Sequence, residues 1–158
     1  MIGRHDPALL AAMTTSLSHR GPDGDGLHVE GPLGLGHRRL AVLDLAGGAQ
    51  PMTSADGAAI VTFNGEIFNY VALRQELLAA GQTLRTRGDT EVLLAGYQLW
   101  GFCGLLARLR GMFAFALYDR RTATLWLARD HLGIKPLYHA TLGDGALLFG
   151  SEPKALLC

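Results

Sequence analysis

Apolar residues recur along this chain with two periods, one typical of helices and one typical of strands. Leucines, methionines and aromatic residues at helical spacing predict helices with four starting points: Asp6-Pro7, Asn69, Asp89 or Thr90, and Phe102. A further helix is expected to begin at Glu152-Pro153. Aspartate followed by proline is a favourable start, because aspartate caps free N–H groups and proline suits the first turn. Gly81 and Gly101 are expected to end two of these helices.

Short apolar runs bounded by glycine and proline turns predict strands. They cover residues 27–29, 33–37, 38–44, 59–63, 83–86, 111–119, 124–130, 137–140 and 146–151. The run over 111–119 is almost wholly apolar, which is typical of a strand buried on both faces. Antiparallel strands joined by tight turns, with a group of helices in the middle of the chain, predict an α+β layered domain.

Length and charge exclude several classes of protein. At 158 residues the chain fits one domain, and 14 basic residues balance 14 acidic ones. We therefore expect no nucleic-acid partner and no anionic membrane surface. The chain also has no run of about 18 apolar residues that could span a membrane, and no signal peptide at its start. Cys103 and Cys158 suggest neither a metal site nor a disulfide, so we expect a cytoplasmic location, with Cys103 a small core residue.

Asn64-Gly65 lies between two apolar runs and has two interpretations. The pair is the strongest short signal for a hairpin turn, because both residues tolerate positive φ. Asparagine also offers a carboxamide donor and glycine an unshielded backbone N–H, and together these can form an oxyanion hole. Glu66 places a charge where a hairpin needs none. The functional interpretation requires two further charged residues, Arg39 and Asp89, to converge on the same pocket.

The other charged residues also allow two interpretations each. Arg38 and Arg39 are neighbours in a strand, so one is expected to face solvent and the other to need an anionic partner, in a salt bridge or a ligand. Asp89 either caps its helix or binds an ammonium group, since a helix N-terminus favours an ionised carboxylate. His19 and Arg20 either anchor their loop or touch a ligand.

Seven motifs in order make a more specific pattern than any one of them. They are HRGPDG at 19–24, GHRRL at 36–40, FNGEIFN at 63–69, GDTEV at 88–92, GMFAFA at 111–116, RDHLGIKPLY at 129–138, and SE with KAL at 151–156. Together they resemble the glutamine amidotransferase domain of glutamine-hydrolysing asparagine synthetases over nearly the whole chain. The resemblance implies an α+β fold of the N-terminal-nucleophile hydrolase type, a four-layer α/β/β/α sandwich, here without its first strand.

The resemblance also implies a reaction and a set of roles. Members of the family hydrolyse the side-chain amide of glutamine, and the ammonia passes to a C-terminal synthetase domain that uses ATP and magnesium to activate aspartate. By motif position, Arg39 would bind the α-carboxylate of glutamine and Asp89 its α-ammonium group. Asn64 and the N–H of Gly65 would form the oxyanion hole. The remaining pocket positions would be Glu66 and the backbone of Leu40 and Val42.

The sequence departs from the family pattern at position 2. The resemblance implies a cysteine there, which becomes the N-terminal nucleophile, but this chain has Ile2. Isoleucine cannot attack a carbonyl group, so we expect the 158-residue chain to hydrolyse no glutamine. We expect residues 1–158 to be one amidotransferase domain, incomplete at both ends and without the synthetase domain. We expect no metal and no cofactor in this chain itself.

Two other functions stay open. The chain could be a non-catalytic remnant that still binds glutamine, or docks on a partner, through Arg39, Asn64 and Asp89. It could also be the amidotransferase domain of a synthetase with another acceptor, because acceptor specificity would lie in the second domain. The resemblance is compatible with a homodimer.

Overall fold

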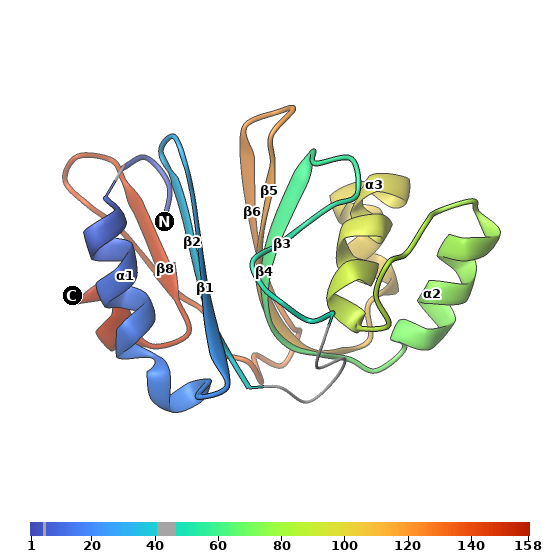
Figure 1. The fold of residues 1–158 in the computed structure, drawn as a ribbon, viewed down its shortest axis with the longest axis horizontal. Coiled ribbons are helices and arrows are strands. Elements are labelled where there is room, and N and C mark those ends of the chain that lie inside the picture. The colour runs from blue at the N-terminus through green and yellow to red at the C-terminus, as the bar shows by residue number, and fades with distance from the viewer. Residues whose placement is uncertain (5, 41–46) are drawn as a thin grey trace.

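The computed structural model describes residues 1–4, 6–40 and 47–158. Two β-layers lie face to face, and helices cover the outer side of each (Figure 1). The helical segments are α1 Pro7–Ser16, η1 Ser18–Arg20, α2 Tyr70–Ala79, α3 Asp89–Arg108 and η2 Pro153–Leu156. The strands are β1 Gly24–Glu30, β2 Leu33–Arg39, β3 Met52–Thr53, β4 Ala59–Ile67, β5 Gly111–Asp119, β6 Thr124–Arg129, β7 Tyr138–Thr141 and β8 Leu147–Gly150.

The first β-layer consists of two hairpins that residues 1–3 join. β1 pairs with β2, and β7 pairs with β8, both antiparallel. Ile2 forms an antiparallel bridge with Leu147 of β8, and the N–H of Gly34 in β2 donates to the carbonyl of Met1 at 2.9 Å. In the described chain no full strand precedes α1, as predicted, but residues 1–3 lie between β2 and β8. α1 covers the outer face of this layer (Figure 1).

The second β-layer is an antiparallel sheet in the order β3-β4-β5-β6. β5 pairs along its length with β4 and also with β6, and both of its faces are covered, which confirms the prediction for this strand. Phe113 and Leu117 face a core shared with α2 and α3. Ala116 faces the other β-layer, where Leu33 and Leu35 of β2 are fully buried. The core between the two layers is what holds the two sheets together.

The helix ends follow the predicted chemistry. Asp6 is the N-cap of α1, and its carboxylate accepts the N–H of Leu9 at 2.9 Å. Gly101 interrupts α3 with a φ of 68° and a ψ of 176°, which breaks the helix into the two stretches that the sequence predicts. No helix among the described residues is long and apolar enough to cross a lipid bilayer.

The segment over 83–86 is not a strand, contrary to the prediction. The buried carboxylate of Glu91 accepts the N–H groups of Arg85 and Thr86 at 3.0 and 2.6 Å. A side chain therefore satisfies the backbone groups that a neighbouring strand would otherwise bond. Of the strand predicted over 38–44, Arg38 and Arg39 belong to β2, Leu40 follows the end of that strand, and residues 41–44 lie outside the described residues.

Cys103 is exposed and is not the core residue that the sequence predicts. It lies in the part of α3 that follows the break at Gly101, where Phe102, Leu105 and Leu106 are the residues that pack against the core. The end of the chain also differs slightly from expectation, because the predicted helix after Glu152 is one 3₁₀ segment, η2.

Candidate functional site

A cavity of about 350 Å³ lies between the two β-layers, near the C-terminal ends of β2, β4 and β8. Six of the seven predicted site residues line it: Arg39, Leu40, Asn64, Gly65, Glu66 and Asp89. The seventh, Val42, lies outside the described residues. The charges that the functional interpretation of Asn64-Gly65 required therefore converge on one pocket.

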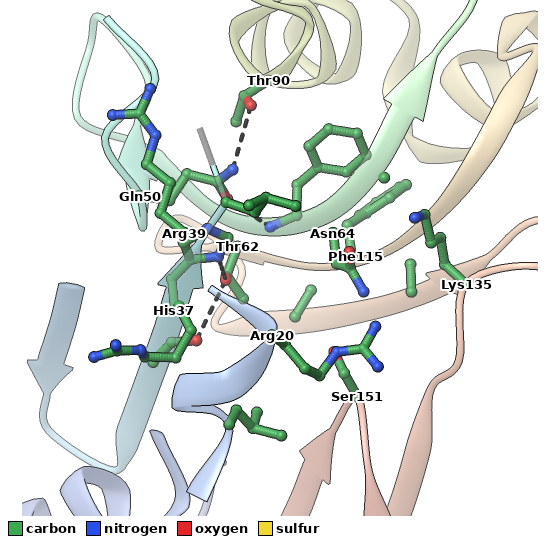
Figure 2. A pocket seen from close by; sticks show the side chains of 18 of the residues that line it. Arg20, His37, Arg39, Gln50, Thr62, Asn64, Thr90, Phe115, Lys135 and Ser151 are labelled. Carbon is green, nitrogen blue, oxygen red and sulfur yellow. Dashed lines mark hydrogen bonds between the residues drawn. The ribbon is translucent and has the colours of Figure 1, made fainter. Parts of the chain in front are cut away.

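Alternation along β2 decides which side chains reach the pocket. Leu33 and Leu35 are buried between the layers, so His37 and Arg39 point into the same space (Figure 2). Arg38 points the other way, where it donates to the carbonyl of Gly21 at 3.1 Å. Its side chain is only 19% exposed, so the expectation that one of the two arginines faces solvent is wrong. The loop that begins at Gly21 covers it.

Asn64 and Gly65 are inside β4 and do not form a turn, so the hairpin interpretation is wrong. They pair with Ala114 and Phe113 of β5. The glycine is required by close packing, because a Cβ atom at position 65 would clash with the carbonyl oxygen of Met112. Its φ of 151° is also rare for other residues. Packing against β5 therefore accounts for the glycine, and Asn64 lines the pocket.

The edge of β4 that faces away from β5 carries a row of N–H groups. The N–H of Phe63 donates to Oε1 of Gln50 at 2.7 Å, and the N–H of Ile67 donates to Oδ2 of Asp89 at 3.0 Å. Successive N–H groups of a strand point to opposite edges, so those of residues 63, 65 and 67 share one edge. The N–H of Gly65 therefore lies between two fixed side chains and points into the pocket that Gly65 lines.

Two carboxylates make one part of the pocket acidic. Burial raises the pKa of Asp89, the charge of Glu66 adds to that increase, and the hydrogen bond from Ile67 opposes it. A carboxylate whose ionised form is disfavoured in this way gains from a cationic ligand group. Arg39 lines the same cavity from β2. The pocket can therefore hold a small ligand that carries both an ammonium group and a carboxylate.

His37 lies beside Arg39 as a neutral imidazole. Its Nδ1 is 3.3 Å from Oγ1 of Thr62 on β4. Burial lowers the pKa of His37 to about 4, and the nearby charge of Arg39 lowers it in the same direction. At neutral pH, Arg39 is therefore the cation that this face of β2 presents to the pocket.

Replacing His37 with glutamine is expected to flatten the pH dependence of stability below neutral pH. The unfolded chain takes up this proton near pH 6.5, whereas the folded chain does so only near 4. Stability is therefore lost as the pH falls through this interval, by up to about 3 kcal/mol. Thermal unfolding at several pH values tests this, with the exposed His139→Gln as a matched control. Parallel curves for His37→Gln and the unchanged chain would contradict it.

Asp130 fixes the loop that forms another wall of the pocket. Its carboxylate accepts the N–H groups of Phe113, Leu132, Ile134 and Lys135, at 2.9 to 3.1 Å. Burial raises the pKa of Asp130, but these hydrogen bonds outweigh burial and hold the pKa at about 2. The loop carries Lys135 into the pocket lining, on the side opposite His37 and Arg39 in the view of Figure 2.

His19 and Arg20, the first two residues of the HRGPDG motif, both contact Glu152. The carboxylate of Glu152 accepts from Nε2 of His19 and from Nη1 of Arg20, each at 3.0 Å. His19 therefore anchors its loop to the end of β8, as one of its two interpretations expects. Arg20 does the same and also lines the pocket.

His37, Gln50 and Lys135 are among the pocket residues that were not identified as site residues from the sequence. Alternation could have found His37, because it is two residues before Arg39 in the same strand. Gln50 and Lys135 lie in irregular segments, where no periodicity assigns a direction to a side chain. Only the folded chain brings them to the pocket.

Comparisons with known proteins agree with this geometry. Residues 1–158 match the family described as glutamine amidotransferase domain. Asparagine synthetase [glutamine-hydrolyzing] 1 of Bacillus subtilis is 44% identical over 94% of this chain and 23% of its own length. A putative asparagine synthetase [glutamine-hydrolyzing] of Mycobacterium tuberculosis strain H37Rv is 44% identical over 98% of this chain and 25% of its own length. The chain thus spans about a quarter of these relatives.

A solved structure shares the fold. Glutamine phosphoribosylpyrophosphate amidotransferase from B. subtilis, complexed with ADP and GMP, superimposes with a TM-score of 0.78 at 26% sequence identity. The match covers 98% of this chain and 42% of that one. Together with the two β-layers between helical layers, this likeness confirms the predicted α+β sandwich.

Proposed function

This chain belongs to the family of glutamine amidotransferase domains, and on that premise we propose that its pocket binds L-glutamine. One observation carries the proposal. The cavity is lined by a guanidinium group, two carboxylates, and a carboxamide next to a strand N–H. These groups match the carboxylate, the ammonium group and the side-chain amide of one amino acid.

The α-carboxylate and α-ammonium groups would be held by opposite charges. Arg39 offers a planar cation, which suits bidentate binding of a carboxylate. Asp89, whose carboxylate is fixed by the N–H of Ile67, would accept the ammonium group, with Glu66 close by. The ammonium group would also relieve the unfavourable burial that raises the pKa of Asp89.

The side-chain amide would lie against β4. Nδ2 of Asn64 and the N–H of Gly65 are donors of the kind that stabilise the oxyanion formed when a nucleophile attacks an amide carbon. Both come from a strand that is paired over its whole length with β5, so they are held rigidly before a ligand arrives. Leu40 lines the same cavity, and its backbone would complete the pocket.

We propose further that the 158-residue chain binds glutamine without hydrolysing it. The resemblance implies that a cysteine at position 2 is the nucleophile that begins hydrolysis, and this chain has Ile2 there. Cys103 and Cys158 are both exposed, and neither belongs to the residues that line the cavity. Asn64 and Gly65 could stabilise an oxyanion, but among the described residues neither cysteine lies in the lining to attack the amide.

Two assays on the purified 158-residue chain test the proposal. Calorimetry should show saturable binding of L-glutamine and much weaker binding of D-glutamine, whose α-groups cannot reach both Arg39 and Asp89 in the same pose. An ammonia assay with L-glutamine should give no signal above a buffer control. Absence of glutamine binding would reject the proposed ligand, and ammonia above the control would reject the non-hydrolytic role.

The acceptor chemistry belongs to a larger protein in this proposal. The relatives named asparagine synthetase are about four times as long as the part that this chain matches. We propose that a synthetase domain with ATP and magnesium is the partner in such a protein, with aspartate as the acceptor of ammonia. The same pocket would serve a synthetase with another acceptor equally well, because its residues contact only the glutamine.

A further inference from the structure

We propose that Gln50 is a positioning residue that sets the length of the amino-acid amide that the pocket accepts. This inference rests on the proposed binding of glutamine. It concerns a residue outside the seven motifs, in the segment that leads into β3.

The two ends of the Gln50 side-chain amide contact the two elements that build the site, β4 and α3. Oε1 accepts the N–H of Phe63 on β4 at 2.7 Å. Nε2 lies 3.4 Å from Oγ1 of Thr90, in the first turn of α3 (Figure 2). Phe63 precedes Asn64, and Thr90 follows Asp89. Gln50 therefore joins the strand that carries the amide-binding donors to the helix that carries the ammonium-binding carboxylate.

A second link between the same two elements closes a ring around Gly65. The N–H of Ile67 donates to Asp89 at 3.0 Å, two residues beyond Gly65 on the same edge of β4. The Gln50 link lies two residues before it. The N–H of Gly65 is thus framed on both sides, and its distance from Asp89 is fixed by two connections instead of one.

The backbone of Gln50 is itself held in place, so the side chain acts from a fixed base. The carbonyl of Gln50 packs so closely against Gly26 of β1 that any Cβ atom at position 26 would clash with it. β1 belongs to the other β-layer. Gln50 therefore connects the edge of β4 and the start of α3 to the β-layer that also carries Arg39.

A fixed separation between the Gly65 N–H and Asp89 discriminates ligands by length. An α-amino acid whose ammonium group is on Asp89 presents its side-chain amide at a distance set by its methylene groups. Glutamine has one methylene more than asparagine, and a difference of this size is worth about 10- to 200-fold when the site is rigid. If Gln50 loses its hydrogen bonds, this polar link is lost while the hydrogen bond from Ile67 to Asp89 remains, and discrimination should fall.

The test compares affinities for L-glutamine and L-asparagine by calorimetry on the 158-residue chain. Gln50→Met keeps the length of the side chain and removes both hydrogen bonds. It is expected to weaken glutamine binding about tenfold and to reduce the glutamine-to-asparagine ratio to about threefold or less. Thr90→Val removes the helix end of the link and is expected to shift the ratio in the same direction.

Two controls separate positioning from general damage. Gln50→Glu should preserve the ratio, because a carboxylate can accept both the Phe63 N–H and the hydroxyl hydrogen of Thr90. Gln75→Met changes an exposed glutamine on α2 and should behave as the unchanged chain does. Thermal unfolding of each variant shows that it is folded before its affinities are compared.

The outcomes distinguish the two proposals. If the unchanged chain binds neither amide, the proposed function fails and this inference fails with it. If the unchanged chain binds glutamine and Gln50→Met binds it with the same affinity and the same ratio, only this inference is overturned. An equal loss of both affinities with an unchanged ratio also overturns it, because that result indicates general weakening and not a change in length selection.

Discussion

Replacing Arg39 with alanine is expected to weaken L-glutamine binding by about 100-fold or more. The guanidinium group is the cation that β2 directs into the cavity, beside a histidine that stays neutral. Removing one partner of a buried, hydrogen-bonded charge pair costs about 2–5 kcal/mol, and about 2.7 kcal/mol corresponds to 100-fold. Calorimetric titration with glutamine measures the loss directly.

Arg108 provides a matched control for that substitution. It lies on the outside of α3, where its guanidinium group is 4.7 Å from the centre of the Trp100 ring. Arg108→Ala is expected to leave the affinity for glutamine within about twofold, since surface substitutions away from a site have small effects. If Arg39→Ala kept the affinity of the unchanged chain, the assignment of the α-carboxylate to this residue would be wrong.

Replacing Asp130 with alanine is expected to lower the Tm by about 10 °C. The substitution leaves four backbone N–H groups without their acceptor, at the start of β5 and in the loop over 132–135. Because Lys135 belongs to this loop, the pocket wall should loosen with it. Thermal unfolding followed by circular dichroism measures the change.

The pH dependence of that difference identifies its cause. The pKa of Asp130 falls from an ordinary value of 3.8 to about 2 in the folded chain. Its contribution is therefore present above pH 3.8 and lost as the pH falls through 2. The gap in Tm between Asp130→Ala and the unchanged chain should narrow over this interval. Asp144→Ala, at an exposed turn, is the control. If its difference in Tm from the unchanged chain narrowed in the same way, the cause would be a general effect of charge.

Periodicity predicted the parts of the fold in which local sequence and tertiary packing agree. The apolar strand β5 and the helix that Asp6 caps are both in place, because their burial follows directly from their pattern. The prediction of a strand over 83–86 failed for a specific reason. Its composition suits a strand, but the carboxylate of Glu91 supplies the hydrogen bonds that a neighbouring strand would have supplied. A pattern of apolar and polar residues does not show where a nearby side chain will bond.

The candidate site was predictable to the extent that its residues lie on regular elements or in recognisable motifs. Arg39, Asn64 and Asp89 were named from the sequence and line one cavity. The turn interpretation of Asn64-Gly65 was wrong because pairing with β5 decides the conformation of this pair, and the strand partner is far away in sequence. Gln50 could not be found, since its role depends on two elements that meet only in the folded chain.

The pairing of β4 with β5 has a consequence for how the chain folds. These strands are neighbours in the sheet, yet α2 and α3 lie between them in sequence. Bringing the strands together closes a long loop, and the entropy of that closure is lost before most of the contacts form. Sheet formation is therefore expected to limit the folding rate. The donors at Asn64 and Gly65 are part of this pairing, so the ability to bind a ligand should appear only with the last, slow step of folding.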